Sequence, residues 1–439
     1  MKKTHTAAPV CIAALSWVLF FSCATNTGLF KKIDGQVSGA SYTRALTEIE
    51  DRRAILYPER NAVLLRLDRG MIEHYAGQYG PSSADLETGE HLIEAAFTKS
   101  VTQEAGSYLV NDNAREYAGE DFEDIYINVF NALNYYQRGD VEGALVEARR
   151  SNEKLSSLSD KYANDLSALS AEAGSAPPDA PDGKVRFANS ALARYLSAVL
   201  YRGSGLADDA RIDFGEVKNA FAQAPSIYSY PLPSTLEGEL PLDQGAARLN
   251  IIAFSGLSPV KVEENLLLPL PFPPPHNSAR LALPRLEPRR SQVNRVEATA
   301  GQNTYRLELL EDLSAAAEET FKAKYALIFF KSFVRSISKV SASAVASAAA
   351  GTTENKNASL IAALIGLVGQ GYALVSEQAD IRCARYFPGR AYVYGVTLPP
   401  GRYTVTVNFW SGNAVVDSVE KTIDLAPGKA NIIEAVSLK

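Results

Sequence analysis

The sequence predicts an α+β protein, in which an N-terminal domain of helical repeats is followed by a β-sandwich-like domain with an inserted helical hairpin. Two observations carry this prediction. Apolar residues recur at intervals of three and four over residues 42–224, which is typical of amphipathic helices. Residues 401–438 instead alternate between apolar and polar side chains, which is typical of strands buried on one face.

The composition is that of a folded protein, because 46% of the residues are hydrophobic and 21% are charged. The length of 439 residues fits two or three domains. A net charge of −6 excludes general affinity for nucleic acid, which requires a basic surface. With four His and three Cys, we expect no disulfide scaffold, no metal centre and no cofactor.

The chain begins with the features of a secretory signal peptide. Lys2 and Lys3 precede an apolar stretch at residues 10–21. Twelve helical residues span about 18 Å, which is too short for a bilayer core of about 30 Å. The stretch ends at Phe20-Phe21-Ser22-Cys23, which resembles a bacterial lipobox, in which the Cys after a small residue is acylated.

We therefore predict a lipoprotein signal peptide at residues 1–22 and lipidation of Cys23, so that the membrane is one partner. The alternative is an ordinary signal peptide with an incidental Cys23. Ala24 follows the cysteine, which by resemblance to bacterial lipoprotein sorting favours the outer membrane. Removal of the signal peptide lowers the net charge to −8 and leaves Cys383 as the remaining free thiol. Residues 23–41 are rich in Gly, Ser and Lys, and we predict a tether there.

The helical domain at residues 42–224 contains a recurring pattern. A glycine ends one helix, and a small residue follows five positions later in the next helix. The three pairs are Gly77 and Ser82, Gly139 and Ala144, and Gly205 and Ala210. This pattern resembles tetratricopeptide repeats, although the copies are too far apart for an uninterrupted array. Generic helical hairpins are the alternative. A Pro-rich loop is predicted near residues 173–183.

The remaining residues, 225–439, combine Pro-rich loops with strands. The predicted strands are 249–254, 279–283, 293–299, 402–410, 414–423 and 431–438. We expect the strands near residues 250 and 280 to join the same sheet as the C-terminal strands. Residues 305–382 are predicted to form the inserted helical hairpin. Its apolar run at 360–375 is shorter than the roughly 20 residues that span a bilayer, so packing within the hairpin is favoured over membrane insertion.

Several segments of the sequence resemble those of a family of uncharacterised bacterial lipoproteins with tetratricopeptide-like repeats. These segments lie at residues 99–108, 111–113, 119–124, 131–145, 256–261 and 377–382. The resemblance implies an envelope location and a helical-repeat N-terminal half. It brings no activity and no catalytic residue with it.

The catalytic motifs that we sought are missing, and we predict that the protein is not an enzyme. The sequence has no Gly-x-Ser-x-Gly, no His-Glu-x-x-His and no phosphate-binding loop that ends in Gly-Lys-Ser/Thr. Four carboxylates fall within residues 120–124. We interpret them as the start of a helix, where negative charge is favourable, rather than as a cation site.

We predict that the surface of the repeats binds a protein partner, because stacked repeats form extended grooves. Amide side chains can pair with a peptide backbone, and Tyr offers a stiff amphipathic contact. The candidate residues on the helix at 124–138 are Tyr126, Asn131, Asn134 and Tyr136. The candidates in the loop before it are Asn111, Asp112 and Asn113. The alternative is that the Tyr residues pack within the hairpin and that the loop is a simple connector.

The favoured function is therefore a lipid-anchored, non-enzymatic scaffold or adaptor of the bacterial cell envelope. One alternative is an accessory factor for peptidoglycan synthesis or outer-membrane assembly, which rests on architectural analogy. A second alternative is a glycan-binding or wall-active protein, in which Trp410, Tyr392 and Tyr394 stack on sugars.

Overall fold

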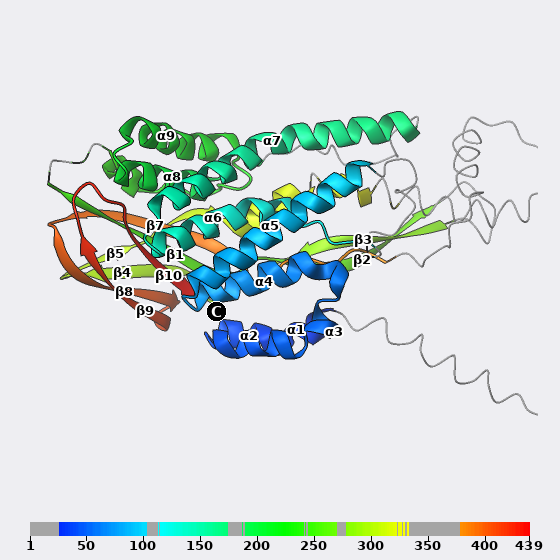
Figure 1. The fold of residues 1–439 in the computed structure, drawn as a ribbon, viewed down its shortest axis with the longest axis horizontal. Coiled ribbons are helices and arrows are strands. Elements are labelled where there is room, and N and C mark those ends of the chain that lie inside the picture. The colour runs from blue at the N-terminus through cyan, green and yellow to red at the C-terminus, as the bar shows by residue number, and fades with distance from the viewer. Residues whose placement is uncertain are drawn as a thin grey trace, which may run out of the picture.

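The structure, a computed structural model, shows the predicted α+β class, with helices first in the sequence and strands second (Figure 1). It describes residues 26–102, 113, 115–173, 187, 189–240, 242, 245–269, 278–322, 324–326, 328–329, 332 and 378–439. None of the helices in these ranges combines the length and the apolar character that crossing a membrane requires.

Three hairpins among the described helices turn at a glycine. α4 and α5 form the first, α6 and α7 the second, and α8 and α9 the third. The helix bounds are α1 (Asn26–Ser38), α2 (Tyr42–Asp51), α3 (Arg53–Leu56), η1 (Glu59–Asn61), α4 (Ala62–Tyr75), α5 (Tyr79–Thr102), α6 (Asp121–Gln137), α7 (Val141–Ala173), α8 (Ala191–Gly203), α9 (Ala207–Gln223) and η4 (Ser234–Gly238). Gly77, Gly139 and Gly205 have φ angles of 73°, 80° and 78°, which glycine adopts without strain.

The small residue five positions after each of these glycines is fully buried, as the sequence pattern predicts. These residues are Ser82, Ala144 and Ala210. Close approach is clearest in the first hairpin, where a Cβ at Gly70 would lie 2.9 Å from the Leu86 side chain.

The described strands form two four-stranded sheets and a two-stranded ribbon. We call β10-β1-β7-β6 the central sheet, β5-β4-β8-β9 the outer sheet, and β2-β3 the ribbon. The strand bounds are β1 (Ala247–Leu257), β2 (Val260–Pro269), β3 (Ser278–Glu287), β4 (Arg295–Ala300), β5 (Asn303–Arg306), β6 (Glu308–Asp312), β7 (Pro388–Leu398), β8 (Gly401–Ser411), β9 (Ala414–Leu425) and β10 (Asn431–Ser437). β1 pairs in parallel with β10 and antiparallel with β7.

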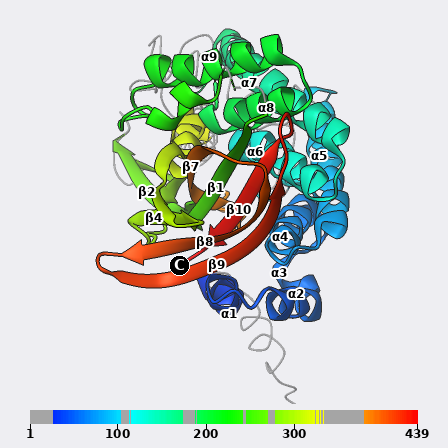
Figure 2. The ribbon, with the colours of Figure 1, turned by 90° about the vertical axis from the view of Figure 1, so that its left-hand side faces the viewer.

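The central sheet lies between the hairpins and the outer sheet, which gives three layers (Figure 2). On β1, Leu249 and Ile251 belong to the core shared with the outer sheet, whereas Ile252 and Phe254 pack against the helices. Every residue of β1 is therefore buried. The two facing sheets are the sandwich-like part of the protein.

The tether predicted at residues 23–41 is wrong for its described part, which forms α1. Phe30, Ile33 and Val37 are spaced by three and four residues and are buried against the body. The surrounding Gly and Lys residues hide this short amphipathic pattern in the sequence.

The predicted start of the helical hairpin at residue 305 is also too early. Residues 303–312 form β5 and β6, and the helix begins at Leu313. Its second arm, including the run at 360–375, lies outside the described residues, as does most of the loop predicted near 173–183.

The strands predicted at 249–254, 293–299, 402–410, 414–423 and 431–438 are confirmed as β1, β4, β8, β9 and β10. The strand near residue 280 is also confirmed, but the prediction that it shares a sheet with the C-terminal strands is wrong, because it pairs with β2 in the ribbon. The same prediction for the strand near residue 250 holds for β10, which pairs with β1, but not for β8 and β9, which lie in the outer sheet. β2 was not predicted because charged residues interrupt its apolar pattern at Lys261, Glu263 and Glu264. β7 was also missed.

Candidate functional site

The four partner-binding residues predicted on α6 do not form an exposed groove. Tyr126, Asn131 and Asn134 have no exposed surface, and Tyr136 is partly buried. α6 is covered by its neighbouring helices on one side and contributes Phe130 to the core beneath them, against Phe254 of β1. The prediction is wrong for these residues because an amide or phenol on a helix can face an interior that supplies hydrogen bonds.

Asn134 belongs to a buried polar chain that joins α4 to β10. Its Oδ1 lies 2.7 Å from Nδ1 of His74, and its Nδ2 donates to Ser82 Oγ at 2.8 Å. His74 Nε2 lies 2.6 Å from Oε1 of Glu434 on β10. Burial disfavours the charged imidazole, but the charge and hydrogen bond of Glu434 outweigh it and raise the pKa of His74.

Tyr136 holds the turn that leads into β10. Its hydroxyl donates to the Ala430 carbonyl at 2.9 Å and accepts from the Ile432 amide at 2.9 Å. The end of α8 reaches the same turn, since a Cβ at Gly203 would collide with Ala430. Tyr136 therefore fixes the last strand of the central sheet against the helices.

Tyr126 contributes to a third buried cluster around Glu311 of β6. The Glu311 carboxylate accepts hydrogen bonds from the hydroxyls of Tyr126, Ser190 and Tyr228 and from the Leu192 amide at the start of α8. Burial raises the pKa of Glu311. The cluster fixes the N-terminus of α8 to the edge of the central sheet.

Asn113, a predicted partner contact, instead binds the backbone of its own chain. Its Nδ2 donates to the carbonyls of Gln378 and Ala379, at 3.3 and 2.9 Å, so the peptide belongs to the same chain. Asn111, Asp112 and the predicted lipidation site Cys23 lie outside the described residues.

Residues 379–387 connect the peptide bound by Asn113 to β7, and Arg382 to Phe387 are buried. Two carboxylates bind amides of this segment: Glu123 of α6 accepts from Ala384 N at 2.6 Å, and Asp68 of α4 accepts from Arg385 N at 2.7 Å. Burial raises the pKa of Glu123 to about 7 and the pKa of Asp68 to about 6. Glu123 also accepts from Glu120 N at 2.9 Å, which agrees with the predicted helix start at residues 120–124.

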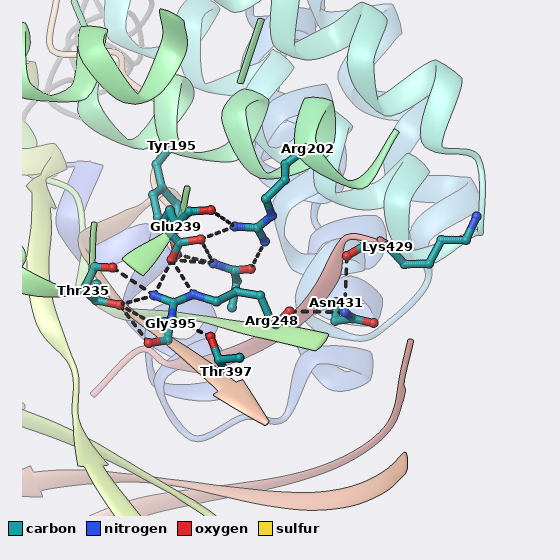
Figure 3. Close-up of polar contacts among 10 residues, drawn as sticks. Tyr195, Arg202, Thr235, Glu239, Arg248, Gly395, Thr397, Lys429 and Asn431 are labelled. Atoms are coloured by element: carbon teal, nitrogen blue, oxygen red, sulfur yellow. Dashed lines mark hydrogen bonds and ion pairs between the residues drawn. The ribbon is translucent and has the colours of Figure 1, made fainter. Parts of the chain in front are cut away.

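A buried ionic cluster surrounds Glu239, just after η4 (Figure 3). Its fully buried carboxylate pairs with Arg202 of α8 and, at 3.1 Å, with Arg248 of β1. Asn250 of β1 joins the cluster by donating to Glu239 at 3.0 Å and accepting from Arg202 at 2.6 Å. Two guanidinium groups on one buried carboxylate make the packing of α8 on the central sheet geometrically specific.

Glu239 was not predicted because the Pro-rich loop around it gives no sign that this carboxylate, unlike Glu237, is buried. A signal was nevertheless present on β1. Arg248 and Asn250 occur at alternate positions in an otherwise apolar strand, and a charge in such a strand requires a buried partner.

These clusters hold the layers together and are closed to solvent, so the candidate for contact with a partner is a surface hollow. It lies between α7, α8 and α9. Figure 1 shows these helices on the side of the protein away from β8 and β9. It encloses about 220 Å³ and is lined by Arg149, Asn152, Glu153, Arg194, Tyr201, Asp209, Ile212 and Asp213.

The hollow combines an exposed apolar side chain with an arginine held in place. Ile212 is 55% exposed. Arg149 Nε donates to the Tyr201 hydroxyl at 2.9 Å, and its guanidinium lies over the Tyr201 ring. Arg194 is instead bound to Asp213 at 2.9 Å. Arg149 is thus a preorganised cation beside an apolar contact.

The aromatic residues of the glycan alternative do not form a common surface. Tyr392 and Tyr394 lie in the core between the two sheets, where Tyr394 stacks on Tyr305 with 5.1 Å between ring centroids. Trp410 faces outwards on β8, but the Arg295 guanidinium covers its ring at 4.5 Å. The sugar-stacking face proposed from these three residues is therefore wrong.

Among the described residues, no three His, Cys, Asp or Glu side chains gather as a metal site would require. Comparison of the chain with family models, with curated proteins and with solved structures gave no match. The class of protein defined here is thus an α+β chain with three Gly-turned helical hairpins packed on a two-sheet sandwich.

Proposed function

We propose that this protein is a lipid-anchored protein of the bacterial cell envelope, and that it acts as a non-enzymatic scaffold for another envelope protein. The anchor is the acylated Cys23, and the outer membrane is its proposed location. The docking surface is the hollow between α7, α8 and α9, and not the buried residues of α6.

The exposed apolar side chain at the hollow carries this proposal. Ile212 lines the hollow, and Leu206, which directly precedes α9, is 39% exposed. Val146, one turn before Arg149 on α7, is 46% exposed. An exposed apolar side chain at a hollow is typical of an interaction surface. The preferred partner segment offers an apolar side chain to Ile212 and a carboxylate to Arg149.

The hairpins supply the architecture for such a role. We infer that they are copies of a tetratricopeptide-like unit, as the Gly turns and the buried small residues suggest. The hollow lies where the second and third copies meet. Repeat proteins bind peptides and protein segments at surfaces shared between neighbouring units.

The test is affinity capture from detergent-solubilised envelopes, with the native lipoprotein and two variants as baits. Ile212→Asp should reduce recovery of the partner by about 30-fold, because loss of an anchor contact costs about 2 kcal/mol. Val415→Asp changes another exposed apolar residue, on β9, and should leave recovery unchanged. Equal recovery with Ile212→Asp would exclude the hollow.

The anchor is tested separately with Cys23→Ser. This variant should move the protein from the membrane fraction to the soluble fraction, because acyl chains provide the membrane affinity. Retention of the Cys23→Ser variant in the membrane fraction, or an intact mass without added lipid, would contradict lipidation.

A further inference from the structure

The first helix of the described chain is a fixed part of the body. Phe30, Ile33 and Val37 of α1 are buried. Asp34, between them, pairs with Arg385 at 2.6 Å and accepts a hydrogen bond from Tyr386 at 3.1 Å. Because Arg385 and Tyr386 lie in the buried segment that leads to β7, α1 cannot swing away from the body without breaking these contacts.

The distance along the chain from the proposed anchor to this fixed helix is very short. α1 begins at Asn26, three residues after Cys23. Three residues span at most about 11 Å, whatever their conformation. If Cys23 is acylated, the first turn of α1 must therefore lie close to the surface of the bilayer.

The element beside this first turn is α3. Arg52, which precedes α3, donates from Nη1 to the Leu29 carbonyl of α1 at 3.1 Å. Tyr57, which follows α3, packs its ring edge-on against Phe30, with 5.6 Å between centroids. Figure 1 shows α3 near the N-terminal end of α1.

α3 presents an apolar side chain to solvent at this place. Ile55 is 66% exposed, and Arg53, two residues before it, is half exposed and lies 3.7 Å from the exposed Glu50. The other large apolar side chains exposed among the described residues belong to other elements, such as Leu267 of β2 and Ile212 of α9. An apolar side chain flanked by arginine suits the boundary between lipid headgroups and acyl chains, where arginine reaches the phosphates.

We infer that the protein rests directly on the bilayer through the first turn of α1 and through α3, with Ile55 inserted at the headgroup boundary. The occupant of this face is a phospholipid surface. The inference rests on the proposed anchor at Cys23. It fixes the orientation of the body, because a three-residue connection and an inserted side chain leave little freedom to turn.

The experiment uses the full-length lipidated protein in vesicles of phosphatidylethanolamine and phosphatidylglycerol. Ile55→Cys carries an environment-sensitive fluorophore, and lipids with a nitroxide on the acyl chain act as quenchers. Cys383 is buried, and burial raises the pKa of its thiol to about 11, so it should not take the label. The matched controls are Ile212→Cys and Leu267→Cys, which are also exposed apolar positions.

Quenching at residue 55 should exceed quenching at residue 212 by about threefold or more, because only the label at 55 would reach the acyl region. Vesicle flotation is measured on the same samples. Flotation without quenching at 55, or with stronger quenching at 267, would overturn the inference and leave the anchor intact. Failure to float would overturn the proposed anchor and the inference with it.

Discussion

Because Gly395 of β7 has no side chain, the carboxylate of Glu239 can occupy the space beside its Cα atom. A Cβ at this position would collide with Glu239 Oε1 and would lie 2.6 Å from Arg248 Nη2. The backbone of Gly395 also exchanges hydrogen bonds with the Thr235 hydroxyl, at 2.7 and 2.9 Å. The missing side chain therefore allows a buried ion cluster to lie directly against a central strand.

Gly395→Ala should destabilise the protein by about 2–3 kcal/mol, because the cluster has no room to move aside. Urea unfolding followed by circular dichroism measures the effect. Gly215→Ala on α9 is the control, since no atom lies within 4 Å of the place that a Cβ would take there and alanine favours a helix. Equal stability of the two variants would show that the cluster tolerates the extra atom.

Glu239→Gln should cost about 3–5 kcal/mol, because it leaves two buried guanidinium groups without a counter-charge. Glu237→Gln changes an exposed carboxylate two residues earlier and should change stability by less than about 0.5 kcal/mol. The same unfolding measurement applies. A small effect of Glu239→Gln would mean that Arg202 and Arg248 find other partners.

Asn134→Ala should cost about 2–3 kcal/mol, since it leaves His74 Nδ1 and Ser82 Oγ without this partner in the interior. Asn219→Ala, on the exposed face of α9, is the matched control. The result separates a structural role from partner binding. Loss of a partner at unchanged stability would restore Asn134 as a contact residue.

Stability should fall as the pH rises from 5 to 8. Burial raises the pKa of Glu123 to about 7 and of Asp68 to about 6, and the pKa of His74 is also raised. Within this window the folded state binds more protons than the unfolded state, so the free energy of unfolding decreases with pH. We expect a decrease of about 4 kcal/mol, of which Glu123 contributes the larger part.

Urea unfolding at several pH values measures this dependence. Glu123→Gln replaces the titrating carboxyl with a neutral group of the same shape, and it should flatten the slope. A free energy of unfolding that stays constant or rises between pH 5 and 8 would show that these groups remain charged inside the protein.

The local elements were predictable because their signals are local. The periodicity of three and four residues marked the helices, and alternation marked β8, β9 and β10. Three turn glycines and the small residues after them marked the hairpins, since only the positive φ and the close packing of a hairpin require those residues there. The short helix α1 was not predictable in this way, because Gly and Lys residues surround its few apolar residues and obscure their spacing.

The candidate sites were less predictable because the sequence does not say which side of a helix is covered. α6 carries Asn and Tyr residues that suit either a groove or an interior, and the choice depended on what packs against it. Its polar side chains find partners such as Ala430, 294 positions away from Tyr136. The hollow at Ile212 likewise exists only where α7, α8 and α9 meet.

The sequence by itself thus determined the class of the fold and the positions of most elements, and it is the basis of the proposal that Cys23 is acylated. The tertiary structure decided which polar residues are buried, how the sheets are layered and which apolar side chains remain exposed. The physical reason is that helix and strand periodicity acts over a few residues, whereas burial depends on contacts such as that of His74 with Glu434, 360 positions apart in the chain.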